Sequence, residues 1–227
     1  MSRTALKDRI LPSYTKGEEI FNMVSHIVGG ALGVAALALC VVFSFLHRDP
    51  YAVVGSFIYG FSIIILYTIS SIYHGITPKA DIAKKVMQII DHCAIFILIA
   101  GTYTPITLAA IREVNPVIGW AMFGFVWGAS ALGIVFNAID IKKYKRFSII
   151  CYLVIGWCAI LSLPTLIEAI TFSGFLYIIL GGVSYSIGAA LYVIGGKKGL
   201  KFMHSVFHIF VVIGTVLQFF AIFFYVI

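Results

Sequence analysis

Long apolar stretches alternate with short polar ones along all 227 residues of the chain. Runs of 18 or more mostly apolar residues are typical of helices that cross a membrane. A membrane β-barrel would instead need short strands of alternating polar and apolar residues, a pattern that the sequence does not have. We therefore expect an all-α integral membrane protein, a bundle of seven transmembrane helices. The runs lie at roughly 20–46, 51–75, 86–111, 117–138, 147–166, 172–194 and 203–227.

The composition supports this expectation and bounds the domain organisation. Hydrophobic residues make up 61% of the chain and charged residues 11%, with a mean hydropathy of +1.06. The seven runs leave too few residues for a soluble domain, so we expect one transmembrane domain over 20–227 and a cytoplasmic N-terminal segment over 1–19. The first run is too long for the apolar core of a cleavable signal peptide, and a mostly polar segment precedes it.

The N-terminal stretch SRTALKDRIL is basic and mildly amphipathic. Such a stretch either lies on the lipid headgroups or forms a disordered leader, and the sequence leaves both open. The four cysteines fall inside apolar runs without the spacing of a disulfide framework or a zinc knuckle. We expect them to be small buried hydrophobic side chains, with Cys93 of interest because it lies close to polar residues. They are Cys40, Cys93, Cys151 and Cys158.

Positive charge is distributed unevenly between alternate loops. Of the 16 Lys and Arg residues, all except Arg48 and Arg112 precede the first run or fall in the second, fourth and sixth loops. Loops rich in Lys and Arg stay in the cytoplasm, so the N-terminus is expected inside the cell and the C-terminus outside. Short basic loops of this kind reflect topology, and the net charge of +7 therefore does not predict a nucleic-acid partner.

Polar residues gather at the predicted cytoplasmic ends of four helices. Polar groups inside a membrane are expensive, and they mark candidate functional sites. Five of the six histidines fall at this depth, whereas His47 lies in the first outer loop, where we expect it to be solvated. The spacings place these residues on shared helix faces. The set comprises Glu19, Asn22 and His26 in the first helix, Ser70 and His74 in the second, Asp91 and His92 in the third, and His204 and His208 in the seventh.

The residue types at this depth suit a zinc site. His204 and His208 are spaced i, i+4, so they lie on one face of a helix. A third histidine from another helix would complete a three-histidine site that keeps one position open for water, and zinc lowers the pKa of that water toward 7. Residue chemistry alone does not choose the third ligand, and His26 remains a candidate. Asp91 would hydrogen-bond the water or orient a ligand, and Ser70 would donate to a developing oxyanion or support His74. His92 lies about 100° around the helix from Asp91, so the two cannot both face one point.

Several segments resemble those of the hemolysin III proteins, the bacterial branch of the progestin and adiponectin receptor group. They occur in order along essentially the whole chain: EEIFNMVSHIVGG, SSIYHG, DHCAIFILIAGTYTP, GGVSYSIGAALY and HSVFHIFVVIG. The resemblance implies a seven-helix bundle with a cytoplasmic N-terminus in a bacterial cell membrane. It also implies zinc held by His74, His204 and His208.

The related alkaline ceramidases are similar in their Ser, Asp and three-His set, and they hydrolyse a lipid amide. This resemblance implies that Ser70 and Asp91 are candidate catalytic groups. It also covers the first-helix motif, Glu19, Asn22 and His26, without giving it a clear role. The chain departs from the pattern at Gln218, where many members have a histidine, far from the predicted site.

Three functions are consistent with the sequence. The first is an integral membrane zinc hydrolase that acts on a lipid amide or ester from the cytoplasmic side. The second is a sensor or regulator of membrane state with a structural zinc, and the third is a pore-forming cytolysin. A pore would need polar residues along the whole bundle, and the outer halves of the helices are mostly apolar. An open metal position favours the enzyme, whereas a fourth ligand such as His26 or Cys93 favours the structural site. The sequence leaves the substrate and the oligomeric state open.

Overall fold

The computed structural model describes residues 4–47 and 49–227 of the chain. Arg3 and Arg48, which contribute to the charge count above, lie outside the described residues. Every element within them is helical, which confirms the all-α prediction. In chain order the elements are η1 (Leu6–Asp8), α1 (Lys16–Leu46), α2 (Pro50–Gly75), α3 (Asp81–Pro105), η2 (Ile106–Ile111), α4 (Arg112–Val114), α5 (Pro116–Asp140), α6 (Lys145–Trp157), η3 (Cys158–Ser162), α7 (Leu163–Lys198) and α8 (Met203–Tyr225).

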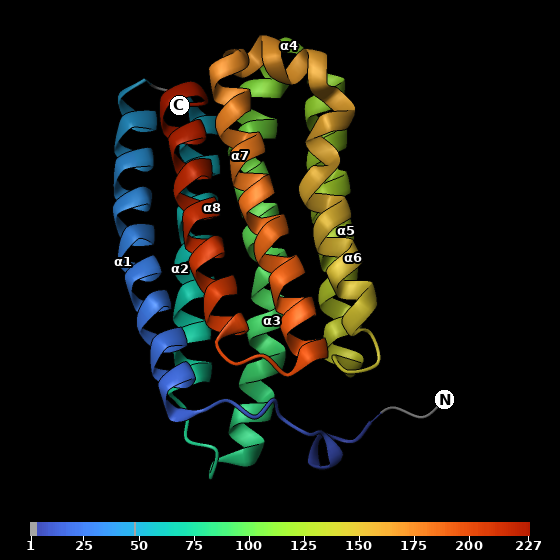
Figure 1. Ribbon diagram of the computed structural model, residues 1–227. Coiled ribbons are helices and arrows are strands. Elements are labelled where there is room, and N and C mark those ends of the chain that lie inside the picture. The colour runs from blue at the N-terminus through green and yellow to red at the C-terminus, as the bar shows by residue number, and fades with distance from the viewer. Residues whose placement is uncertain (1–3, 48) are drawn as a thin grey trace.

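Six helical stretches of the described chain are long and apolar enough to cross a membrane, where the sequence pattern predicts seven. One of them, Lys145–Lys198, has 54 residues and contains two of the predicted runs. Thr171 breaks its helical geometry with φ 63° and ψ 168°. In Figure 1 this stretch rises along one side of the bundle, turns at the end and returns beside α8. The start of α1 and the C-terminus lie at opposite ends of the bundle (Figure 1).

Capping residues explain where the helices begin. Thr15 and Glu18 form a capping box, which starts α1 at Lys16, four residues before the apolar run. Asp49 caps α2 and Asn115 caps α5, and each cap is followed by a proline in the first turn. Proline suits that position because its missing N–H would have no partner there. Polar residues just outside the apolar runs therefore set these boundaries.

Helix α3 and its continuation through η2 are the most buried of the spanning stretches. Pro105 ends the regular α-helical pattern, and the next six residues form a π-helix. Proline lacks an N–H, so the backbone around it must find other partners. The hydroxyls of Thr104 and Thr107 each donate to a carbonyl four residues earlier, at 2.8 Å. The chain therefore crosses the centre of the bundle with its polar groups largely paired.

Consecutive long helices pack side by side, and α8 packs against α1 to close the bundle. Small residues let α1 and α2 approach closely. A Cβ on Gly33 would lie 2.6 Å from Ile63, and one on Gly60 would lie 2.6 Å from Leu37. This contact brings the polar face of α1 between α2 and α8, which carry the candidate histidines.

Residues 4–15 cross the end of the bundle at which α1 begins (Figure 1). The Thr4 N–H donates to the Asp140 carboxylate at 2.9 Å. The buried Arg9 guanidinium donates to the carbonyl of Ile139 at 3.2 Å. Lys85 donates to the carbonyl of Lys7 at 3.0 Å. The described part of the N-terminal stretch is therefore not a disordered leader, because hydrogen bonds tie it to the ends of α3 and α5.

Candidate metal centre

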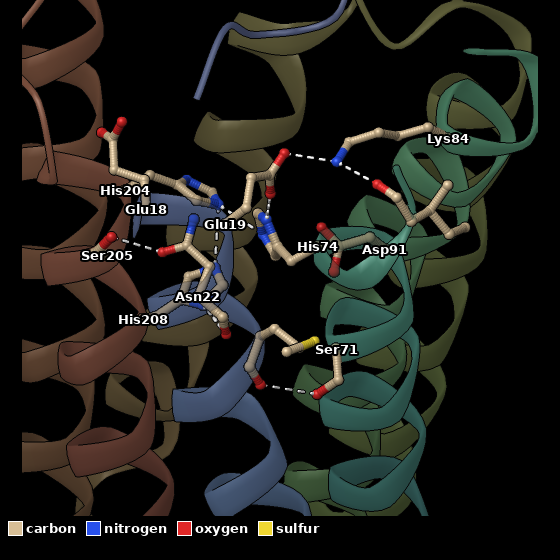
Figure 2. Close-up of polar contacts among 12 residues, drawn as sticks. Glu18, Glu19, Asn22, Ser71, His74, Lys84, Asp91, His204, Ser205 and His208 are labelled. Atoms are coloured by element: carbon tan, nitrogen blue, oxygen red, sulfur yellow. Dashed lines mark hydrogen bonds and ion pairs between the residues drawn. The ribbon is translucent and has the colours of Figure 1, made fainter. Parts of the chain in front are cut away.

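Three histidines converge at the end of the bundle covered by the N-terminal stretch. His204 Nε2 lies 3.0 Å from His208 Nε2 and 3.3 Å from His74 Nε2. Each residue offers a nitrogen that lies within 4.8 Å of the other two. His204 and His208 are one turn apart on α8, and His74 lies in the last turns of α2, as Figure 2 shows. The structure thus brings together the three histidines that the resemblance selects.

Hydrogen bonds fix which nitrogens face the centre of this cluster. His74 Nδ1 donates to the Glu19 carboxylate at 2.6 Å, which in a neutral imidazole ring leaves the lone pair on Nε2. His208 Nδ1 faces the carbonyl of Asn22 at 3.3 Å, which assigns a lone pair to its Nε2 as well. Both lone pairs point at His204 Nε2, which can donate a hydrogen to only one of them. A cation shared by the three nitrogens resolves this conflict, so the donor set fits a metal such as zinc.

Glu19 connects His74 to a buried lysine. One carboxylate oxygen accepts from His74, and the other accepts from Lys84 Nζ at 2.6 Å. Lys84 is 2% exposed, and it also donates to the carbonyl of Ile76 at 2.9 Å. A buried charge needs a partner of opposite sign. The Lys84 ammonium therefore balances Glu19, and Glu19 holds the orientation of the His74 ring (Figure 2).

Asn22 and His26 extend the α1 face toward α8. The Ser205 hydroxyl donates to the Asn22 side-chain oxygen at 2.7 Å. His26 stacks on His208, with ring centroids 3.6 Å apart and planes 9° from parallel. Both His26 ring nitrogens are buried without a hydrogen-bond partner. His26 is not part of the three-nitrogen cluster, so within the described residues it packs behind the cluster and does not complete it.

The N-terminal stretch places an aromatic ring over the cluster. The Tyr14 ring stacks on His204 with a centroid distance of 5.1 Å and lies 5.9 Å from the His74 ring. Burial raises the pKa of the Tyr14 phenol, which therefore stays neutral. Glu18 accepts from the backbone N–H of Phe202 at 2.6 Å, which ties the start of α1 to the loop before α8. These contacts cover the histidines on the side away from the bundle.

Asp91 and Ser70 lie beside the cluster but outside the group of three ligand nitrogens. Asp91 is 7% exposed, and Figure 2 shows its carboxylate near His74. Ser70, which is 1% exposed, lies beside the Asp91 carboxylate on the adjoining helix. The His92 Nδ1 donates to the carbonyl of Gln88 at 2.9 Å and lies 3.7 Å from the Asp91 carboxylate. Both side chains line the same cavity, so the 100° between their positions on α3 does not separate them as the sequence predicts.

A cavity of about 180 Å³ extends from this cluster into the bundle. Along α3 and the first residue of η2 its lining runs from Asp91 to Ile106, which lies fifteen residues further along the chain, or about 22 Å of helix. The end near the cluster is polar, and the remainder is mostly aliphatic and aromatic. A separate hollow between α6 and α7 adjoins it and shares Leu153 and Trp157 with its wall. The polar lining residues at the cluster end are His26, Ser70, Asp91, His92, Asn137, Lys145, Ser148, His204 and His208.

Other sequence predictions also have a clear place in the structure. His47 is exposed at the end of α1, far along the chain from the cluster. All four cysteines are free thiols, and the Cys93 thiol faces the carbonyl of Ile134 at 3.8 Å. In the part of the chain that the structure describes, no cysteine, carboxylate or fourth histidine joins the three-nitrogen group. The described residues therefore offer three candidate ligand nitrogens at this point.

Sequence reasoning missed two contributors to this centre. In the sequence, Lys84 is only one of the positive charges that predict the membrane topology. It lies seven residues before Asp91, however, and therefore on a similar face of α3. That spacing was the available signal. Tyr14 gave no signal, because its position over the histidines depends on how the N-terminal stretch folds back across the bundle.

The bundle and its histidine cluster define a multi-pass membrane protein with a candidate metal centre at one end. A family model described as Haemolysin-III related matches residues 14–219. The chain belongs to this family, which confirms the resemblance drawn from the sequence motifs.

The relatives support this assignment. "Hemolysin-3" of Bacillus cereus is 36% identical over 210 residues, covering 92% of each chain. "Hemolysin-3 homolog" of Bacillus subtilis (strain 168) is 35% identical over 212 residues, covering 93% of this chain and 96% of the relative. "Monocyte to macrophage differentiation factor" of Homo sapiens is 26% identical over 212 residues, covering 89% of this chain and 79% of the relative. The similarity therefore spans almost the full chain, including every residue of the centre.

Proposed function

We propose that this protein is a zinc-dependent hydrolase that cleaves the amide or ester bond of a membrane lipid at the cytoplasmic side of a bacterial cell membrane. The observation that carries the proposal is the position of the histidine cluster at the polar end of a long apolar cavity. Zinc in a three-histidine site acts as a Lewis acid and lowers the pKa of bound water to about 7. Water adds to the acyl carbon, and the products are a fatty acid and an amine or alcohol.

The protein's own residues have distinct tasks in this reaction. Glu19 and the carbonyl of Asn22 hold the His74 and His208 rings in the tautomers that present Nε2 to the metal. Asp91 accepts a proton from the attacking water and returns it to the leaving group. Ser70 donates a hydrogen bond to the oxygen on which negative charge develops. The absence of a fourth protein ligand among the described residues supports an open site, as an enzyme needs.

The shape of the cavity supports a lipid as the substrate. An amphiphile would place its polar linkage at the histidines and its chain along the aliphatic lining of α3, α7 and α8. The hollow between α6 and α7 adjoins this lining, so a lipid could enter sideways from the bilayer. The N-terminal stretch, with Tyr14 over His204, covers the cytoplasmic side. Entry through the wall of the bundle therefore suits the substrate better than entry from the cytosol.

The relatives' printed name, hemolysin, suggests a pore as another function. A water-filled pore needs polar side chains along its length, whereas this cavity is mostly aliphatic and aromatic beyond the histidine end. A regulatory protein with a structural zinc is the stronger alternative, because the same histidines would hold the metal without turnover. The proposed hydrolase makes no use of nucleic acid.

The proposed orientation has seven crossings, with the N-terminus in the cytoplasm and the C-terminus outside. It treats the stretch Lys145–Lys198 as two crossings separated at Thr171. The start of α1 and the C-terminus lie at opposite ends of the bundle in Figure 1, and this arrangement supports the orientation, as does the bias of positive charge between alternate loops. A reporter that is active only outside the cytoplasm should work when fused after Ile227 and fail when inserted at 142–146. The opposite pattern would overturn the orientation.

The experiment that tests the proposed chemistry compares wild-type protein with Asp91→Asn. Asparagine keeps the size of the side chain but cannot accept the proton, and general base catalysis contributes about 10²–10⁴-fold in rate. Asp91→Asn should therefore lose nearly all hydrolysis while keeping most of its zinc. Ser70→Ala should lose less, since removing one oxyanion donor costs about 10²–10³-fold.

The assay uses purified protein in liposomes with a panel of ceramides and glycerolipids. Fatty acid release is measured by mass spectrometry, and metal content is measured in parallel. No turnover by the wild type across the panel, or equal turnover by Asp91→Asn, would overturn the catalytic role. The regulatory function with a structural zinc would then replace it.

A further inference from the structure

Gln218 lies deep in the apolar part of the cavity, on the same helix as two of the clustered histidines. Five α8 side chains line the cavity, and Gln218 is the last of them, ten residues after His208. At 1.5 Å of rise per residue the two are about 15 Å apart along the helix. Neighbouring lining residues such as Val211 and Ile178 are aliphatic. A polar side chain in such surroundings needs an explanation.

The Gln218 amide is held in one orientation and leaves its oxygen without a partner. The amide N–H donates to the carbonyl of Ile178 at 3.0 Å. A reversed amide would place two carbonyl oxygens against each other, so this bond fixes the assignment. Gly181 leaves room for the Gln218 amide because it has no side chain, and a Cβ there would lie 2.6 Å from Gln218 Nε2. The side chain is 94% buried, since it belongs to a residue only 6% exposed, and its Oε1 has no hydrogen-bond partner.

The neighbouring hydroxyls also offer acceptors and not donors. Thr215, three residues before Gln218, donates to the carbonyl of Val211 at 3.0 Å. Its hydroxyl hydrogen is therefore used, so Tyr67 at 2.8 Å and Tyr185 at 3.0 Å must both donate to the Thr215 oxygen. Tyr185 lines the cavity. Because its hydroxyl hydrogen is donated to Thr215, its oxygen can only accept a further hydrogen bond. Thr215 and the two tyrosines bonded to it therefore offer no hydrogen-bond donor to the Gln218 oxygen.

We propose that Gln218 forms a binding subsite for a hydroxyl group carried on the hydrocarbon chain of the bound lipid. The lipid has its polar linkage at the histidine cluster and its hydroxyl about 15 Å further along the cavity. The hydroxyl donates to Gln218 Oε1, which satisfies a buried acceptor that an unsubstituted chain leaves unpaired. This subsite rests on the lipid cavity of the proposed function, but it does not require turnover.

Fatty acid binding tests the subsite without any need for hydrolysis. Purified protein in detergent is titrated with octadecanoate, 12-hydroxyoctadecanoate and 6-hydroxyoctadecanoate, and bound ligand is counted by native mass spectrometry. We expect the wild type to bind the 12-hydroxy acid about tenfold more tightly than the unsubstituted acid, the value of about one hydrogen bond to a buried group. The 6-hydroxy acid should bind no more tightly than octadecanoate, because its hydroxyl lies too near the carboxylate to reach Gln218.

Gln218→Leu should remove the preference and leave zinc content unchanged. Gln88→Leu, the same substitution at a glutamine outside the cavity lining, should keep it. Gln218→Met provides a second apolar variant if the leucine variant does not fold. A wild type with no preference for the 12-hydroxy acid, or one that binds none of the acids, overturns the subsite, as does a preference that survives in the folded Gln218 variants. A preference without any lipid hydrolysis leaves the subsite in place and removes only the hydrolase.

Discussion

The two walls of the cavity are built differently. On the α1, α2 and α8 side, polar side chains are paired across helices, as Glu19 is with both His74 and Lys84. On the α6 and α7 side, the 13-residue α6 passes into the 3-10 segment η3, and a hollow separates the two helices. Trp157 bridges them through one hydrogen bond to Ser186, at 3.0 Å. The first wall is suited to holding ligands in place, and the second to admitting a chain from the bilayer.

The glycines in the two walls also differ in how closely they are packed. Gly33 lies where α1 and α2 are in close contact, and a Cβ there would come within 2.6 Å of Ile63. Gly182 lies on the α7 face near Trp157, where a Cβ would come no closer than 3.5 Å. Close packing resists deformation, whereas open packing tolerates it. Substitutions in the first wall should therefore damage the metal centre or the fold, and matched substitutions in the second should change how lipids enter.

Glu19→Gln should give the largest effect of the variants outside the histidines themselves. Glutamine cannot serve both His74 and Lys84 as a charged acceptor, so the ring of His74 loses its fixed orientation. Loss of such a partner typically weakens metal binding by about 10–100-fold. Zinc affinity is measured by competition with a chelator. Glu113→Gln, at an exposed glutamate in the short helix α4, is the matched control. Equal affinity in the two variants would show that Glu19 does not position His74.

Gly33→Ala should destabilise the bundle more than Gly182→Ala. Adding a methyl group to a filled contact typically costs about 1–3 kcal/mol. At Gly182 the added methyl group makes ordinary contacts, and alanine also favours the helix. Thermal unfolding in detergent should therefore show a lower midpoint for Gly33→Ala and little change for Gly182→Ala. Equal midpoints would mean that the two walls do not differ in packing.

Trp157→Phe should have the smallest effect, and it should appear in lipid exchange and not in metal content. The change removes the hydrogen bond to Ser186, which is worth about 0.5–1.5 kcal/mol. Release of a fluorescent fatty acid should become roughly two- to tenfold faster, which is that energy expressed as a rate ratio. Trp120→Phe, at an exposed tryptophan on α5, provides the control. Unchanged release in Trp157→Phe would argue against entry between α6 and α7.

Helix periodicity and loop charge predict the common depth of five histidines, whereas the choice of His74 as the third member of the cluster rests on the resemblance to the hemolysin III proteins. The i, i+4 spacing of His204 and His208 fixes their common face, and the depth of His74 follows from the ends of the apolar runs. The first, second, fourth and seventh predicted runs agree with helix boundaries within four residues. The third run is divided between α3 and η2. The fifth run extends to about 166 whereas α6 ends at Trp157, and the sixth begins at about 172 whereas α7 begins at Leu163.

Other features of the site depend on contacts between helices that periodicity does not describe. Glu19 reaches both His74 and Lys84 because α1 packs closely on α2 through Gly33 and Gly60. The role of the Asn22 carbonyl depends on α8 packing against α1. The free oxygen of Gln218 appears only once Ile178 is placed beside it. These are tertiary contacts between residues far apart in the chain.

Metal content of the purified protein tests the central claim most directly. Inductively coupled plasma mass spectrometry should find about one zinc per chain in the wild type, as a single three-histidine site requires. The metal should be lost largely in His74→Ala, His204→Ala and His208→Ala, and it should be retained in His47→Ala. A wild-type protein without zinc, or a His74→Ala variant that keeps its zinc while His26→Ala loses it, would contradict the account.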